Sequence, residues 1–140
     1  MRTLVFSTVI SLAVLGCAKD EAKPAQHVKL SETVPTITID ELEAKLGSGD
    51  YQAVDANGDA TRKKLGVIPG AVLLTDSEAF STSELPKDKG KTLVFYCANT
   101  HCGASEEAAA RALTAGYTNV RVLPDGIAGW VKAGKKVQTI

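Results

Sequence analysis

The chain has 140 residues, and its 16 lysines and arginines are balanced by 16 aspartates and glutamates. That length suits one domain, and a hydrophobic share of 44% is typical of a globular protein. A formal net charge of zero excludes nucleic-acid binding through bulk positive charge. Three cysteines are too few for a disulfide-dense scaffold. The function is therefore expected to reside in a local site.

The amino terminus has the pattern of an export signal. Arg2 supplies a positive charge before an apolar run over residues 4–15, which is shorter than the roughly 20 residues that cross a bilayer. The run ends in Val14–Cys17, which resembles the lipobox of bacterial lipoproteins. The resemblance implies removal of residues 1–16, acylation of Cys17 and a lipid anchor in the membrane. The alternative is a plain secretory signal with an incidental cysteine.

The residues after Cys17 predict which membrane holds the anchor and where the folded domain begins. Ala18 and Lys19 follow, and the absence of aspartate there favours the outer membrane of a Gram-negative cell, with the protein facing the periplasm. Residues 17–35 are polar and contain proline, which predicts a lipidated flexible tether. Residues 36–140 are expected to form the folded domain.

The rest of the chain alternates between short apolar or β-branched runs and helical patterns. Such alternation predicts βαβ units, and hence an α/β domain with a mostly parallel sheet flanked by helices. Asp40 is the expected amino-terminal cap of the first helix, and a long surface connection is expected over residues 77–90. The five predicted strands are 37–39, 51–55, 71–74, 93–96 and 120–123, and the predicted helices are 41–46, 60–65, 105–115 and 126–133.

Cys97 is the first candidate for a chemical role. It directly follows the most hydrophobic predicted strand and precedes a loop and a helix. Ligands of parallel sheets usually bind beyond the carboxyl ends of the strands, and N–H groups at a helix start favour a thiolate, which is the nucleophilic form. The alternative is a small buried hydrophobic residue at a strand end, a common role for free cysteine.

Four stretches within residues 37–137 form an ordered set of motifs. Residues 54–57 (Val-Asp-Ala-Asn) end a strand, and residues 67–71 (Val-Ile-Pro-Gly-Ala) hold a Pro-Gly turn. Residues 95–97 (Phe-Tyr-Cys) precede a loop and a helix, and residues 122–130 close with Gly126, Gly129 and Trp130. The set is similar to the rhodanese (sulfurtransferase) family, and it implies a single rhodanese-like domain.

The resemblance also implies a chemistry and a set of site residues. Family members transfer sulfane sulfur by way of a persulfide on the loop cysteine, here Cys97. The implied partners are a small sulfur donor, polysulfide or thiosulfate, and a thiol acceptor, with no cofactor. Asp55 is the strand-end acid that would support the loop. The residues of the implied anion-binding loop are Ala98, Asn99, Thr100, His101, Cys102 and Gly103.

The loop departs from the family in its charge. Many active members have arginine or lysine where this chain has Ala98 and Cys102, and arginine where it has Asn57. Glu106 and Glu107 add negative charge in the first turn of the following helix. Thiosulfate is a dianion, so we expect weak thiosulfate:cyanide activity at best. The missing cation also argues against phosphatase or arsenate-reductase chemistry.

Cys102 and His101 add further hypotheses. The spacing of Cys97 and Cys102 would allow an intraloop disulfide, or a resolving thiol that attacks a persulfide or sulfenate on Cys97; alternatively Cys102 is a small loop residue. His101 is a candidate proton shuttle or a surface residue without a role. The three thiol and imidazole groups have awkward spacing for zinc, so no metal is expected. Arg62 and Arg111 are expected to be solvated helix charges.

The leading hypothesis is a monomeric cell-envelope sulfurtransferase or persulfide carrier that uses Cys97. One alternative is a thiol–disulfide redox module that uses Cys97 and Cys102. The other is a binding module that kept the fold and lost turnover.

Overall fold

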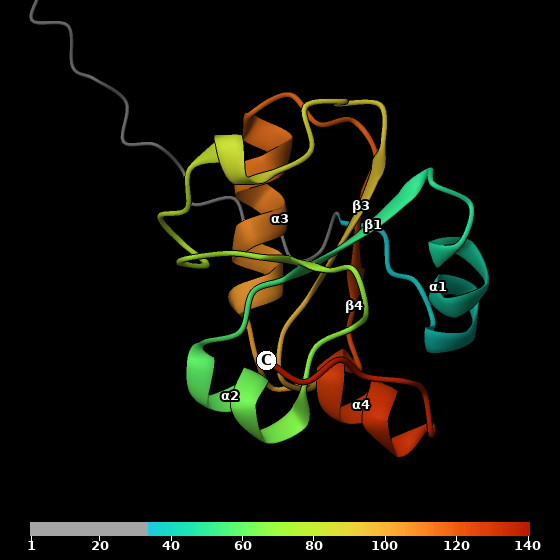
Figure 1. The fold of residues 1–140 in the computed structure, drawn as a ribbon. Helices are drawn as coiled ribbons and strands as arrows, with labels where there is room; N and C mark the ends of the chain where they lie inside the picture. Colours follow the sequence, from blue (N-terminus) through green and yellow to red (C-terminus); the bar gives the residue numbers. More distant parts are fainter. Residues whose placement is uncertain (1–33) are drawn as a thin grey trace, which may run out of the picture.

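A computed structural model describes residues 34–140 (Figure 1). The predicted signal, the predicted acylation site Cys17 and most of the predicted tether lie outside the described residues. The fold begins before the expected boundary at residue 36, because Val34 is buried and the carbonyl of Pro35 accepts a hydrogen bond from the Val122 N–H. Within this part of the chain, no helix has the length and apolar character needed to span a bilayer.

The sheet is parallel throughout, as predicted, but it has four strands where five were expected. They are β1 (Tyr51–Asp55), β2 (Val72–Leu73), β3 (Thr92–Tyr96) and β4 (Val120–Leu123). Their order in the sheet is β2-β1-β3-β4, so the chain crosses over after each strand. The right-handed βαβ geometry that this requires places helices on both faces.

The missing strand is the one expected at residues 37–39. Only a parallel bridge between Thr36 and Val122 forms beside β4. The chain then turns, because the Thr38 hydroxyl accepts a bond from the Glu41 N–H while the Glu41 carboxylate accepts one from the Thr38 N–H. This capping box starts the first helix at Ile39. Thr38, and not Asp40, is therefore the cap.

Four helices surround the sheet, and a short 3-10 helix lies in the long connection. Figure 1 shows α1 and α3 on opposite sides of the sheet, with α2 and α4 at the end where β1 and β3 finish. The alanines of α3 that face the sheet let the helix pack closely. The elements are α1 (Ile39–Leu46), α2 (Asp59–Leu65), η2 (Thr82–Glu84), α3 (Ala104–Thr114) and α4 (Gly126–Lys132).

The alternation of side chains along β3 divides the core into two clusters. Leu93 and Phe95 pack into the cluster that includes the buried face of α3. Val94 and Tyr96 point to the opposite face and pack with residues of α1 and α4. Each of these fully buried apolar side chains contributes about 1.5–3 kcal/mol relative to exposure. The carboxyl end of β3 is thereby clamped from both sides, which positions the residue that follows it.

Candidate functional site

The loop of residues 97–103 joins β3 to α3 at the carboxyl end of the sheet. Two of its amide groups bond within the loop: the Cys102 N–H donates to the Asn99 carbonyl over 3.1 Å, and the His101 N–H donates to Asn99 Oδ1 over 3.0 Å. These two amides are already used in shaping the turn. Asn99 is therefore a structural residue of the loop in addition to any contact with a ligand.

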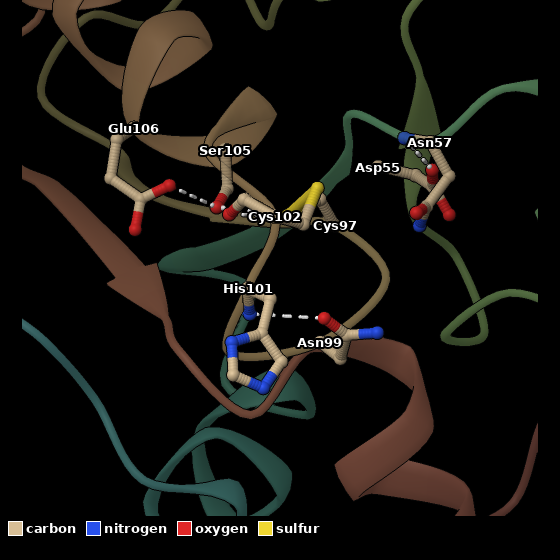
Figure 2. The surroundings of a disulfide bond; sticks show 8 residues. All are labelled: Asp55, Asn57, Cys97, Asn99, His101, Cys102, Ser105 and Glu106. Carbon is tan, nitrogen blue, oxygen red and sulfur yellow. Dashed lines mark hydrogen bonds between the residues drawn. A yellow bond between two sulfur atoms is a disulfide. The ribbon is translucent and has the colours of Figure 1, made fainter.

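Cys97 and Cys102 are joined by a disulfide across this loop (Figure 2). Their Cα atoms are 6.3 Å apart, within the range that a disulfide requires. The pairing that the sequence spacing allowed is thus present in the structure. The two sulfurs differ in accessibility, because Cys97 is 2% exposed whereas Cys102 is half-buried.

Ser105, in the first turn of α3, provides the polar surroundings of Cys97. Its hydroxyl oxygen lies 3.4 Å from Cys97 Sγ and 2.9 Å from Glu106 Oε2. The serine is 2% exposed, and the glutamate is half-buried. Glu107, the next residue, is exposed to solvent. A buried sulfur, a buried hydroxyl and a partly exposed carboxylate therefore lie in a row.

The start of α4 packs directly on the loop. The N–H groups of Ile127 and Ala128 donate to the carbonyls of Cys97 and Ala98 over 2.9 and 3.0 Å. Gly126 has a φ of +60°, and a Cβ atom there would lie 2.5 Å from the Cys97 carbonyl oxygen. Only glycine allows this approach. The closing motif of residues 122–130 therefore supports the cysteine loop as well as the core.

A buried ionic network occupies the neighbouring end of β1. Asp55 is fully buried, and its Oδ1 accepts bonds from the Asn57 N–H over 2.7 Å and from Arg62 Nε over 3.3 Å. The Arg62 guanidinium also donates to the carbonyls of Asp55 and Leu74. Asp55 does support a loop, but that loop is its own turn after β1.

One of the two sequence expectations about arginine is corrected here. Arg62 is not a solvated charge: it is 7% exposed because it neutralises Asp55 and ties β1 to the residue after β2. Arg111 is at the surface, but its Nε donates to the Phe80 carbonyl, and its guanidinium lies 5.3 Å from the centre of the Phe80 ring. Neither arginine belongs to the cysteine loop.

Tyr96, the residue before Cys97, is a packing residue. It is fully buried, and its hydroxyl accepts a bond from the Ile68 N–H over 3.1 Å, which anchors the Pro-Gly turn. Burial, and then the negative charge of Asp55, raise the pKa of the phenol far above its ordinary value. Tyr96 therefore stays protonated and is not an acid or base for the loop.

The remaining predicted site residues are at the rim. Asn99, Thr100, His101 and Gly103 are exposed, and Ala98 is half-buried. Figure 2 shows the His101 ring pointing away from the disulfide, so the proton-shuttle role stays a prediction. No group of metal-ligating side chains lies together within residues 34–140.

The electrostatic character of the site follows from these positions. The loop of residues 97–103 has no lysine or arginine. The guanidinium of Arg62, at the neighbouring end of β1, is already paired with Asp55. Glu106 and Glu107 begin the helix beside it. Such a site can hold a nucleophilic or redox-active sulfur, but it lacks the charge that binds a dianion tightly.

Sequence reasoning missed one polar residue of this site and one beside it. The sequence pattern marks Ser105 only as the start of a helix, although its position within the first turn after the loop is the available signal. Arg62 lies seven residues after Asp55 on a short helix, and the sequence has no pattern that marks it as buried. Both are polar residues whose burial depends on how elements pack.

A parallel sheet whose third strand ends in a cysteine loop, closed by a Gly–Trp helix, defines the class of protein. The profile of the family described as "Rhodanese-like domain" matches residues 38–133. The chain belongs to the rhodanese-like domain family, as its sequence motifs predicted. No curated protein sequence matches it.

Solved structures share the fold at low sequence identity. A protein from Bacillus halodurans is 22% identical with a TM-score of 0.66, covering 79% of this chain and 80% of that one. A thiosulfate sulfurtransferase from Pseudomonas aeruginosa is 22% identical in sequence with a TM-score of 0.64, and the match covers 80% of this chain and 21% of that one. A 3-mercaptopyruvate sulfotransferase from Escherichia coli is 23% identical with a TM-score of 0.63, and the match covers 77% of this chain and 51% of that one. Proteins of this fold thus include sulfur-transfer enzymes.

Proposed function

We propose that this protein is a cell-envelope sulfurtransferase or persulfide carrier whose nucleophile is Cys97. The single observation that carries the proposal is the placement of Cys97. It lies at the clamped carboxyl end of β3, its carbonyl is held by α4, and its sulfur is paired with a second cysteine of the same loop. Membership of the rhodanese-like family and the sulfurtransferases of the same fold support this chemistry.

The disulfide must be opened before sulfur can be loaded. Two electrons and two protons from an external thiol reductant convert Cys97 and Cys102 to thiols. The Cys97 thiolate then attacks a sulfane sulfur of the donor. The S–S bond of the donor breaks, its electron pair leaves with the shortened polysulfide or with sulfite, and Cys97 retains the sulfur as a persulfide.

The persulfide has two ways to discharge. An acceptor thiolate attacks the outer sulfur, forms a new persulfide and returns Cys97 as a thiolate. Alternatively, the Cys102 thiolate attacks Cys97 Sγ, which forms the disulfide and expels hydrosulfide. The second route ends in the state that the structure contains, and it is the resolving role proposed for Cys102. Neither step uses a cofactor.

The charge of the site favours polysulfide over thiosulfate as the donor. Glu106 and Glu107 repel an anion, and the repulsion grows with its charge. A polysulfide can also react as its monoprotonated form, whereas thiosulfate remains a dianion at neutral pH. The loop offers no side-chain cation to offset the difference. The predicted signal at residues 1–16 and the predicted acylation of Cys17 are the basis for the envelope setting, which intact-mass analysis of the mature protein would test.

The decisive experiment is mass spectrometry of the reduced full chain after separate exposure to polysulfide and to thiosulfate. We expect one added sulfur on the Cys97 peptide with polysulfide and little with thiosulfate. Cys97→Ser should abolish the gain, and Cys102→Ser, the matched control, should retain the persulfide for longer because it cannot be resolved within the loop. Sulfur gain in Cys97→Ser would refute the assignment.

The disulfide itself favours a second candidate, a thiol–disulfide redox module that uses Cys97 and Cys102. The same experiment separates the two functions. A redox module would interconvert its dithiol and disulfide with a partner thiol and would gain no sulfur from either donor. The binding-module alternative predicts no change at either cysteine.

A further inference from the structure

Ser105 has one hydroxyl hydrogen and two neighbours that can accept it. Its Oγ lies 2.9 Å from Glu106 Oε2 and 3.4 Å from Cys97 Sγ (Figure 2). The serine is 2% exposed, so solvent offers little alternative partner. In the disulfide state Cys97 is neutral and a weak acceptor, whereas the Glu106 carboxylate is a strong one. The hydrogen therefore belongs to Glu106 while the disulfide is closed.

Opening the disulfide changes this competition. An external thiolate reaches Cys102 Sγ more readily than Cys97 Sγ, because Cys102 is half-buried whereas Cys97 is only 2% exposed. Attack there forms a mixed disulfide on Cys102, breaks the Cys97–Cys102 bond and leaves the electron pair on Cys97 as a thiolate. A thiolate is a charged acceptor, and a hydrogen bond to a charged group is about twice as strong as a neutral one.

We propose that Ser105 is the hydrogen-bond donor to the Cys97 thiolate, and that Glu106 is a positioning residue that restrains this thiolate by competing for the same hydrogen. This proposal rests on the proposed function, because it concerns the reduced Cys97. The hydroxyl turns from Glu106 to Cys97 when the thiolate forms and turns back when the disulfide closes. Glu106 thus limits the thiolate through Ser105 in addition to repelling it by charge.

The other charged groups around Cys97 are arranged differently. Asp55, at the end of β1, is paired with Arg62 of α2. The His101 ring points away from the sulfur, and Asp125 lies exposed before α4. Glu107 has the same charge as Glu106 in the same helical turn, but it is exposed, and no hydrogen bond in the described structure joins its side chain to Ser105. Glu107 is therefore a matched control for charge alone.

The test measures the alkylation rate of Cys97 in the reduced full chain, by mass spectrometry, across the pH range in which thiols titrate. We expect Glu106→Gln to speed alkylation at neutral pH about tenfold and to lower the pH of half-maximal rate. Glu107→Gln should change the rate less than about twofold. Ser105→Ala should slow it about tenfold, and Ser105→Thr, which keeps the hydroxyl, should restore it.

The double variant Ser105→Ala/Glu106→Gln decides whether Glu106 acts through Ser105. If it does, Glu106→Gln changes little in the Ser105→Ala background beyond the effect of Glu107→Gln. Equal effects in both backgrounds, or equal effects of the two glutamates, would overturn the proposal. Failure of Cys97 to gain sulfur would instead refute the proposed function and leave this result standing.

A second measurement tests the direction of opening. The oxidised chain is treated with glutathione and then quenched with an alkylating reagent. Glutathione should be found on the Cys102 peptide and the alkyl group on Cys97 of the same molecule. Glutathione on Cys97 would contradict the assignment of Cys97 as the leaving sulfur.

Discussion

The carboxyl ends of β1 and β3 are neighbours in the sheet, and they differ in whether a positively charged side chain is present. At the end of β1, Asp55 and Arg62 form a buried ion pair through Asp55 Oδ1, and the Arg62 guanidinium also donates to the carbonyls of Asp55 and Leu74. At the end of β3, the cysteine loop has no lysine or arginine, and Glu106 and Glu107 lie in the first turn of the helix that follows it. The fold thus uses a positive charge to fix the architecture beside the site and leaves the reactive sulfur without one.

The comparison separates the contacts that hold the scaffold at the end of β1 from those that shape the cysteine loop. The strand-end acid and its arginine hold the turn after β1, independently of the loop's electrostatics. The loop can then vary in charge without loss of the scaffold. The variants below break one region or the other, from the largest expected effect to the smallest.

Removing Arg62, the α2 cation that neutralises Asp55 at the end of β1, should have the largest effect. Arg62→Met leaves Asp55 as an unpaired buried charge and removes the donor to the Leu74 carbonyl, so we expect a loss of about 3–5 kcal/mol in the free energy of unfolding. Urea denaturation measures it. Adding Asp55→Asn should recover part of the loss, and an unchanged stability of Arg62→Met would show that the ion pair is dispensable.

The contact between α4 and the loop gives the next prediction. Gly126→Ala places a methyl group 2.5 Å from the Cys97 carbonyl oxygen at a positive φ, so we expect a loss of about 2–3 kcal/mol. Gly134 also has a positive φ, but open space surrounds it. Gly134→Ala should therefore cost about 1 kcal/mol. Equal losses in thermal denaturation would exclude a specific role of the close approach.

Adding a cation to the cysteine loop should give the end of β3 a positive charge, as the end of β1 already has, and should improve the reaction with thiosulfate. Ala98→Arg places a guanidinium beside Cys97, where it can pair with the bound thiosulfate dianion. A partly exposed ion pair of about 1 kcal/mol corresponds to a roughly five- to tenfold increase in rate. We expect that gain in the rate of sulfur loading from thiosulfate, measured on the reduced protein. Ala98→Gln controls for size. A gain that persists at high salt would argue against an electrostatic origin.

The smallest effect is expected in the long connection over residues 77–90, at the carboxylate of Glu84 in the short 3-10 helix. The N–H of Thr75, and then its hydroxyl and the Ser81 N–H, hold the pKa of Glu84 below its ordinary value, with burial opposing. A lowered pKa stabilises the fold above the unfolded pKa, and this is lost as the pH falls through the folded value. Glu84→Gln should lower Tm at neutral pH, and the difference should vanish in acid. A constant difference would contradict the linkage.

The sequence predicted the features that depend on local pattern. The parallel α/β fold, the position of Cys97 at a strand end and the chance of pairing with Cys102 all follow from hydrophobic runs and spacing. The expected strand at residues 37–39 was wrong because the Thr38–Glu41 capping box outweighs three β-branched residues. That box is itself a sequence signal, so this error was avoidable.

The features that sequence reasoning missed depend on how elements pack. Arg62 belongs to a short helix rich in charge, and its burial arises only when α2 docks beside β1. The contact of Ser105 with Cys97 requires the loop to fold back so that the start of α3 meets the strand end. No period of 2 or 3.6 residues encodes either event.

The start of α4 has one further consequence. The sequence contains a single tryptophan, Trp130, and it lies in this same short helix, buried and with its indole N–H donating to the Lys136 carbonyl over 2.8 Å. The helix is bonded at its first turn to the carbonyls of Cys97 and Ala98. The protein therefore contains its own fluorophore in the helix that is hydrogen-bonded to the disulfide loop, and we expect its emission to change when the disulfide opens, without any added label.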